Sequence, residues 1–199
     1  VHLLNRQKGL ADNTVSAVYK DKEGFVWFGT RNGLSRYDGR QITNFEQSNS
    51  YPSISNLKEV FDGVLAFVDN GVFSAFDLKK ERFLSVVSSS GQGIPSRGML
   101  QKNDSLVWVI SGSELHLMKR CASKEGELRL RVQEKYTGWD NQDNLLVAIT
   151  YSSDKKSICL IDEKGRIILL DATNLNSFRA IDLGRTGSLS VNSVLYDDG

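Results

Sequence analysis

A unit of four short strands recurs along this chain of 199 residues, and the recurrence limits its fold more than any other feature. In the clearest copy, alternating and apolar runs predict strands at residues 14–20, 25–30, 34–37 and 41–45. The connections are short and carry Asn-Gly or Asp-Gly pairs, which tolerate the positive φ of tight turns. Connections this short make successive strands antiparallel neighbours. The unit is therefore expected to be a four-stranded antiparallel meander.

Weaker copies of this unit follow along the chain. Trp108 lies 81 residues after Trp27, at the same point of the third copy. Leu65-Ala66 takes the position of Trp27 in the second copy, and Cys159 takes it in the fourth. Repeats of about 39–49 residues that hold four strands are typical of β-propeller blades, which bury their faces against their neighbours. The sequence predicts an all-β fold, a partial β-propeller built of four-stranded antiparallel blades.

The repeats divide the chain into an incomplete β-propeller. The expected units are blade 1 at residues 10–46, blade 2 at 47–88, blade 3 at 89–133, blade 4 at 134–184 and the start of a fifth blade at 185–199. A blade cut inside its first hairpin leaves backbone groups unpaired, so we expect the remaining blades in the same, longer polypeptide. Residues 1–9 are a candidate for the outer strand that closes the ring, and Asn56–Phe61 has the spacing of a short helix.

Composition excludes several classes of protein. Hydrophobic residues make up 40% of the chain and charged residues 25%, which indicates a globular protein rather than a disordered one. A formal net charge of +1 gives no bulk field that would draw the chain onto nucleic acid or an anionic membrane. The longest apolar runs have five residues, whereas a membrane helix needs about 20. Membrane attachment is therefore expected only through a downstream segment.

Residues with catalytic chemistry are sparse. The two histidines, His2 and His116, lie in no nucleophile–base pattern and at no metal-ligand spacing, so we expect no catalytic residue, metal or cofactor. Two cysteines cannot make a disulfide framework, and we expect Cys121 and Cys159 to be unpaired thiols, with one bridge between them as the alternative. Carboxylates paired across blades would make a glycosidase or lyase, an alternative that stays open.

Several conspicuous residues have a structural explanation. Trp27 and Trp108 are expected to pack one blade on the next, and Gly29 to permit a close approach of the neighbouring blade. Asp21 and Asp197 are expected to cap the amides of their own turns. Trp139 fits no position of the repeat, and its loop setting makes it the candidate for an exposed aromatic residue that stacks on a ligand.

Binding residues are expected on one rim of the propeller. If the strands of a blade are lettered A to D, the B–C turns share a rim with the D–A connections between blades. Amides, guanidinium groups and carboxylates hydrogen-bond sugar hydroxyls or anionic substituents. The candidates of this kind, together with two aromatic residues, are Asn13, Arg31, Asn32, Tyr51, Asp69, Asn70, Arg97 and Trp139.

One stretch of the first copy is similar to a known repeat. The pattern V-x-x-V-x-x-D-x-x-G-x-V-W-F-G-T-x-x-G-L-x-x-Y-D-G over Val15–Gly39 resembles the two-component-regulator propeller repeat. That repeat builds the N-terminal periplasmic sensor region of hybrid two-component systems (sensor histidine kinase and response regulator) of Bacteroidetes. The resemblance is strong over residues 9–45, moderate over residues 190–199 and faint between them.

The resemblance implies a fold and a function. Chains of this family carry two propellers, typically seven-bladed, a small β-sandwich, one membrane helix, and then kinase, receiver and DNA-binding domains. It implies a periplasmic, non-catalytic sensor fragment that helps to recognise an oligosaccharide and so controls transcription of polysaccharide-use genes. Histidine kinase activity would lie outside this chain. The alternatives are a scaffold for a protein partner or a homodimer, and a propeller glycosidase or lyase.

Overall fold

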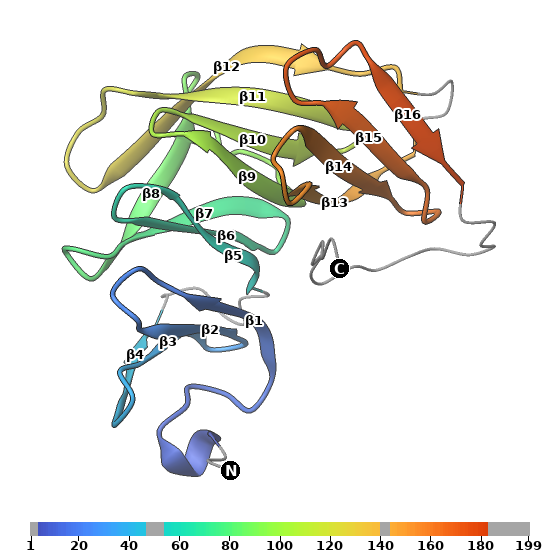
Figure 1. Cartoon of the computed structure of the whole chain (residues 1–199). Helices are drawn as coiled ribbons and strands as arrows, with labels where there is room; N and C mark the ends of the chain where they lie inside the picture. The colour runs from blue at the N-terminus through green and yellow to red at the C-terminus, as the bar shows by residue number, and fades with distance from the viewer. Residues whose placement is uncertain (1–3, 47–53, 140–143, 183–199) are drawn as a thin grey trace.

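The structure is a computed structural model that describes residues 4–46, 54–139 and 144–182. Its strands fall into four successive groups of four, which form an arc (Figure 1). Blade 1 has β1 (Val15–Lys20), β2 (Val26–Thr30), β3 (Gly33–Tyr37) and β4 (Ile42–Phe45). Blade 2 has β5 (Ile54–Phe61), β6 (Val64–Asp69), β7 (Val72–Asp77) and β8 (Arg82–Ser88). Blade 3 has β9 (Gly98–Asn103), β10 (Leu106–Ser111), β11 (Glu114–Cys121) and β12 (Glu127–Tyr136). Blade 4 has β13 (Leu146–Tyr151), β14 (Ser157–Asp162), β15 (Ile167–Asp171) and β16 (Phe178–Ile181).

Each blade is an antiparallel meander, so the predicted all-β architecture is confirmed. The strand bounds of blade 1 agree with the predicted ones to within one residue. In blade 3, β12 continues to Tyr136, three residues past the expected boundary at residue 133. The expected start of a fifth blade at residues 185–199 lies outside the described residues. None of the helices in the described ranges is long and apolar enough to span a membrane.

Two local predictions are wrong. Asn56–Phe61 is part of the strand β5 and not a helix, because its backbone pairs with β6. The described part of the segment 1–9 contains no strand but the short 3-10 helix η1 (Arg6–Lys8). The side chain of Asn5 caps η1, and Gly9 ends it at φ 102°, a left-handed conformation that glycine adopts without strain.

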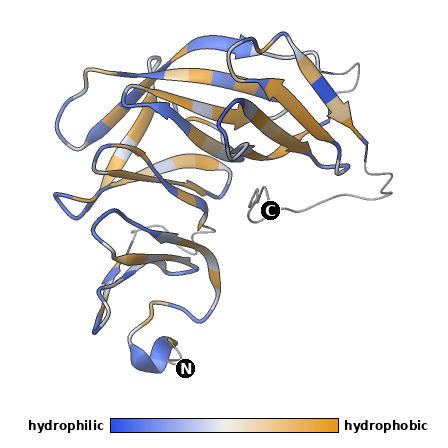
Figure 2. Ribbon diagram, viewed as in Figure 1, coloured by the Kyte–Doolittle hydropathy of each residue, from blue (hydrophilic) through white to orange (hydrophobic). Residues whose placement is uncertain are grey.

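Hydrophobic side chains gather between consecutive blades, where the strands are orange in Figure 2. Trp27 belongs to the cluster between blades 1 and 2, Ala66 to the one between blades 2 and 3, and Trp108 to the one between blades 3 and 4. The repeat position marked by Trp27 therefore faces the next blade each time. Both tryptophans are only 1% exposed, which confirms their predicted packing role. A Cβ on Gly29 would lie 2.5 Å from Ile54 Cγ2, so glycine does permit the close approach of blade 2.

Blades 2 and 3 are joined more closely than the other neighbours. Their outer strands β8 and β12 pair in parallel, from Glu127 opposite Ser85 to Leu130 opposite Ser88. The eight strands thus form one sheet whose end strands, β5 and β9, pack side by side, so that the sheet is nearly closed. Ala66 is fully buried in the cluster between the two blades, at the position that tryptophan takes at two other interfaces. We expect the small side chain at this position to help the two outer strands approach each other.

Substitution Ala66→Phe tests this explanation. The added ring has no space in a close-packed interior, so we expect a loss of stability of about 1–3 kcal/mol. We also expect faster hydrogen exchange at the amides of residues 85–88 and 127–130, because the larger side chain separates the two outer strands. Mass-spectrometric hydrogen exchange measures this. The paired residues 85–88 and 127–130 of β8 and β12 form a seam between the two blades. Unchanged exchange at this seam in a destabilised variant would contradict the role given to Ala66.

Candidate functional site

The predicted binding residues lie on the B–C turns and on the segments before the A strands, as the strand order requires. Arg31 and Asn32 form the turn between β2 and β3, and Asp69-Asn70 the turn between β6 and β7. Two further candidates, Asn13 and Arg97, lie shortly before β1 and immediately before β9. Tyr51 lies outside the described residues.

Several of these side chains hold their own loops. Asn13 Oδ1 accepts a hydrogen bond from Arg6 N at 2.8 Å, and Asn32 Nδ2 donates to Ala11 O at 3.2 Å. Asn70, which has a positive φ of 48°, donates from Nδ2 to Asp69 Oδ1 at 3.0 Å. These contacts give the residues a role in loop structure, and their role in binding stays a prediction.

Trp139 is the candidate that lines a cavity. The cavity has a volume of about 260 Å³ and lies on the B–C rim, between blades 3 and 4. The residues around it come from the β10–β11 turn, the connection between the two blades, and the strands and B–C turn of blade 4. They are Ser113, Glu114, Thr137, Gly138, Trp139, Asn144, Leu146, Asp162, Arg166 and Ile168.

Trp139 is not the exposed aromatic residue that the sequence suggested. Its side chain is 7% exposed and packs in the cluster between blades 3 and 4, with Leu146 and Ile168. Its Nε1 donates to Ser113 O at 3.4 Å, which ties the connection to blade 3. The prediction failed because a residue outside the repeat still fills a blade interface. Trp139 therefore contributes a wall of the cavity and not a free stacking platform.

Asp162 and Arg166 form the charged base of the cavity. Asp162 Oδ1 accepts the backbone N–H groups of Lys164 at 3.0 Å and Arg166 at 2.9 Å. Asp162 Oδ2 accepts Arg166 Nε at 3.1 Å and Nη2 at 2.9 Å, and Asn144 Nδ2 lies 3.3 Å away. The side chain of Asp162 is 1% exposed and that of Arg166 19% exposed, so the carboxylate is almost completely removed from water and the guanidinium largely so. Sequence reasoning missed both residues.

A sequence signal for Asp162 did exist. Asp162 and Gly165 repeat the D-x-x-G spacing of Asp21 and Gly24, in the B–C turn of blade 4 instead of the A–B turn of blade 1. Asp21 Oδ1 likewise accepts the N–H groups of Glu23 and Phe25, which confirms its predicted capping role. The same spacing thus marks an aspartate that closes its own turn, whichever pair of strands the turn connects.

Glu114 provides an acceptor at the mouth of the cavity. His116 Nε2 lies 2.6 Å and Lys135 Nζ 3.4 Å from Glu114 Oε2. The hydrogen bond with His116 and the charge of Lys135 together hold the pKa of the Glu114 carboxyl below its usual value. Glu114 therefore remains ionised at neutral and mildly acidic pH, where it accepts hydrogen bonds.

Cys121 and Cys159 are free thiols in this structure, not a bridged pair. Burial raises the pKa of the Cys159 thiol, which lowers its reactivity as a nucleophile. Within the described ranges, no three histidine, cysteine, aspartate or glutamate side chains are grouped as a metal site would need.

Solved structures with a similar fold include β-propeller domains. The extracellular domain of BT3049 from B. thetaiotaomicron, assigned to a hybrid two component system, superposes with a TM-score of 0.66 at 18% identity. The similarity covers 87% of this chain and 24% of that one. The corresponding domain of BT4673 gives a TM-score of 0.50 at 14% identity over 88% of this chain and 30% of that one. Virginiamycin B lyase from Staphylococcus aureus gives 0.57 at 11% identity over 88% and 58%.

These similarities establish the fold, and a family model matches a short stretch of the sequence. This chain spans about a quarter of the length of the BT3049 domain, and among proteins of curated function no sequence match was found. The family model described as the two component regulator propeller matches residues 9–32. That range covers β1, β2 and the turn that follows β2. Residues 9–32 therefore carry a two component regulator propeller repeat, within the first blade of a partial β-propeller.

Proposed function

We propose that this chain is part of the periplasmic sensor region of a hybrid two-component signalling protein, and that it binds a glycan fragment without turning it over. The observation that carries the proposal is the two component regulator propeller repeat at residues 9–32. The similar fold of two extracellular domains assigned to such systems supports it. Further blades of the same polypeptide would complete the ring, and the kinase would lie downstream.

The cavity between blades 3 and 4 suits one sugar unit. Its 260 Å³ is slightly below the range of about 300–1,000 Å³ that is usual for ligand pockets, so it would hold one ring of a longer oligosaccharide. Glu114 and Ser113 offer hydrogen-bonding groups for hydroxyls, while Leu146, Ile168 and Trp139 offer apolar walls. A sugar ring also presents both polar groups and apolar faces, so this mixed lining suits it.

Binding is testable with the whole extracellular region. We expect oligosaccharides from one class of polysaccharide to raise the melting temperature, with no product released. A ligand at 100 times its Kd stabilises the folded state by about 2.7 kcal/mol, which such a scan detects easily. Calorimetry then gives the Kd, which we expect to rise about tenfold or more in Glu114→Gln, because a charge-assisted hydrogen bond is lost.

The matched control is Glu125→Gln. Glu125 is also an exposed, ion-paired glutamate of blade 3, but it lies in the β11–β12 turn, at the other rim. We expect it to bind like the unmodified protein. Equal weakening by both variants would reject the cavity as the site. A shift with none of the glycan classes would reject the glycan and favour a scaffold for a protein partner.

A further inference from the structure

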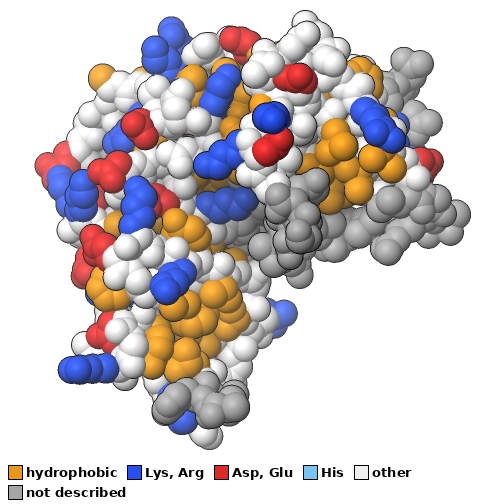
Figure 3. Space-filling view, in the orientation of Figure 1, with side chains coloured by type: hydrophobic (Ala, Val, Ile, Leu, Met, Phe, Trp, Pro, Cys, Tyr) orange, Lys and Arg blue, Asp and Glu red, His pale blue; other side chains and the backbone are white. Residues whose placement is uncertain are grey.

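A second cavity lies on the opposite rim, where the A–B and C–D turns of blades 1 and 2 meet. Its volume is about 450 Å³, larger than that of the cavity between blades 3 and 4. Acidic and basic side chains gather along this edge, at the left of Figure 3. The residues that line this groove are Asp21, Lys22, Glu23, Phe25, Trp27, Arg36, Glu59, Asp62, Gly63, Leu78, Lys79 and Glu81.

The floor of the groove already holds a guanidinium group. Arg36 Cζ lies 4.9 Å from the ring centre of Phe25 and 5.6 Å from that of Trp27. Arg36 Nη1 also lies 2.6 Å from Glu81 Oε1, on blade 2. The protein's own arginine thus shows what this end of the groove accommodates: a cation on aromatic faces with a carboxylate beside it.

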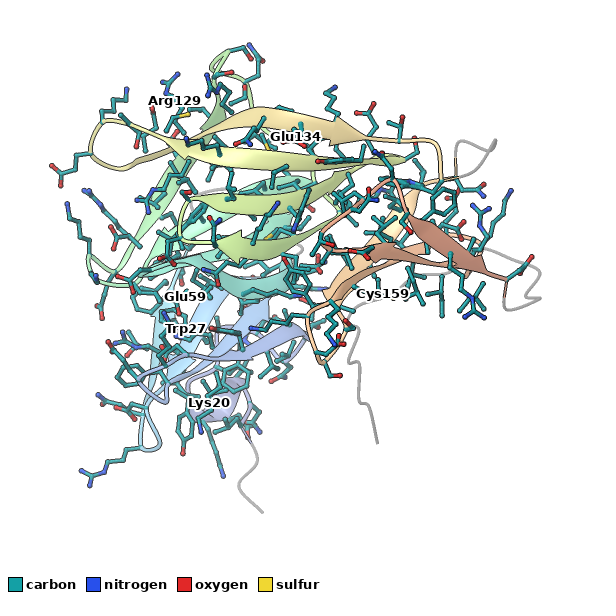
Figure 4. All side chains as sticks on the ribbon, turned by 45° about the horizontal axis from the view of Figure 1, so that its top comes forward. Lys20, Trp27, Glu59, Arg129, Glu134 and Cys159 are labelled. Carbon is teal, nitrogen blue, oxygen red and sulfur yellow. The ribbon has the colours of Figure 1, made fainter. Side chains whose placement is uncertain are left out.

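Carboxylates outnumber cations around the groove. Five acidic residues and three basic ones line it, so its formal charge is negative. Within the groove, Glu59 is the most enclosed carboxylate that pairs with an exposed lysine. Its side chain is 9% exposed, and its Oε1 accepts Gly63 N at 3.0 Å and Lys22 Nζ at 3.1 Å. The side chain of Lys22 is 72% exposed, and an ion pair held by so exposed a lysine contributes little. In Figure 4 the side chains of Glu59 and Trp27 lie close together, at the boundary of the two blades.

We propose that this groove binds a cation with an apolar stem, an alkylguanidinium or alkylammonium group. The cation takes the place of Lys22 beside Glu59, and the stem lies against Phe25 and Leu78. The side chain of Lys22 then moves into solvent, which is possible because it is already largely exposed. Such a group is either the side chain of an arginine or lysine in another protein or a free amine. The site is independent of the glycan cavity, since the two lie on different rims and between different blades.

The indole N–H resonance of Trp27 reports on this groove. Trp27 Nε1 donates to Asp21 Oδ2 at 2.7 Å, and both residues line the groove. A blocked Ala-Arg-Ala peptide and agmatine are titrated into the full isotope-labelled chain, with blocked Ala-citrulline-Ala as the uncharged equivalent. We expect a saturable shift of the Trp27 resonance with the cations, weakened by added salt, and none with the citrulline peptide.

Matched variants locate the cation. Glu59→Gln keeps a carbonyl oxygen for Gly63 N–H but removes the charge, and we expect its Kd to rise about tenfold or more. If Glu59→Gln does not fold, Glu23→Gln takes its place as the test variant, because Glu23 is an exposed residue of the same groove. Glu125→Gln is the negative control: it lies on blade 3, and we expect it to leave the Kd unchanged. Binding of the peptide alone identifies a protein side chain as the source, and binding of agmatine alone identifies a free amine. The proposal is overturned if neither cation binds, if citrulline binds equally well, or if both groove variants bind normally.

Discussion

Replacement of Trp27 by alanine is expected to lower the free energy of unfolding by about 3–5 kcal/mol, the range for a large aromatic residue removed from a core. The indole is 1% exposed and lies 5.6 Å from the ring of Phe45 and 5.5 Å from that of Phe76, between the ring centres. Its removal opens a cavity between blades 1 and 2. It also leaves Asp21 Oδ2, in a side chain that is largely buried, without its indole donor.

Chemical denaturation followed by circular dichroism measures this effect. Trp27→Phe serves as the matched control, because it keeps an aromatic ring but removes the donor to Asp21. We expect it to cost less than the alanine variant. Val18→Ala, on a side chain that is 61% exposed, should change stability by less than about 0.5 kcal/mol. A Trp27→Ala variant as stable as Val18→Ala would show that Trp27 does not hold the two blades together.

The second large effect is expected for Asp162→Ala. Breaking a buried ion pair by removing one of its partners costs about 3–5 kcal/mol. The side chain of Arg166 is only 19% exposed, so water replaces the lost carboxylate poorly. The same substitution frees the N–H groups of Lys164 and Arg166, and the turn between β14 and β15 loses its cap.

Asp171→Ala provides the comparison for the turn alone. Asp171 Oδ1 accepts the N–H groups of Thr173 and Asn174 in the same manner, but its side chain is exposed and holds no arginine in the described contacts. We expect a loss of about 1 kcal/mol for this variant. The double variant Asp162→Ala/Arg166→Leu should recover part of the loss, because no charge then stays buried. Similar losses in Asp162→Ala and Asp171→Ala would show that the ion pair contributes nothing beyond the turn.

The repeat itself was predictable because its signals are local. Turn pairs such as Asp38-Gly39 and the short connections limit where each strand begins and ends, and the observed strands of blade 1 follow them. Positions that face the next blade could also be found, since Trp27 and Trp108 recur at equivalent points. The turns depend on residues a few positions apart, and the equivalent points recur within the same sequence, so this sequence alone was sufficient.

The error at Asn56–Phe61 has a physical cause. Leu57, Val60 and Phe61 are spaced as on a helix, and all three are buried. In β5 that spacing arises from register shifts against β6 between residues 55 and 58 and between residues 59 and 61. A β-bulge inserts one residue and so changes the strand period of two locally. The spacing of buried residues in a bulged strand therefore imitates a helix.

The cavity and the seam could not be predicted because they depend on distant contacts. The cavity brings Ser113, Trp139 and Asp162 together from three separate segments, and nothing in their spacing indicates this. The pairing of β8 with β12 joins strands of two different blades, and it becomes apparent only when the two sheets face each other. Rim positions, in contrast, follow from strand order, which is why the described candidate loops lie together on the predicted edge.

The seam between β8 and β12 also makes one joint of the arc different from the other two. Blades 2 and 3 share one hydrogen-bonded sheet, so backbone hydrogen bonds as well as side chains hold them together. The described strands of blades 1 and 2, and those of blades 3 and 4, are joined by no such ladder, and side chains fill most of those gaps. These two joints are where the two cavities lie. A molecule bound in either cavity therefore contacts two blades that no ladder of backbone hydrogen bonds joins.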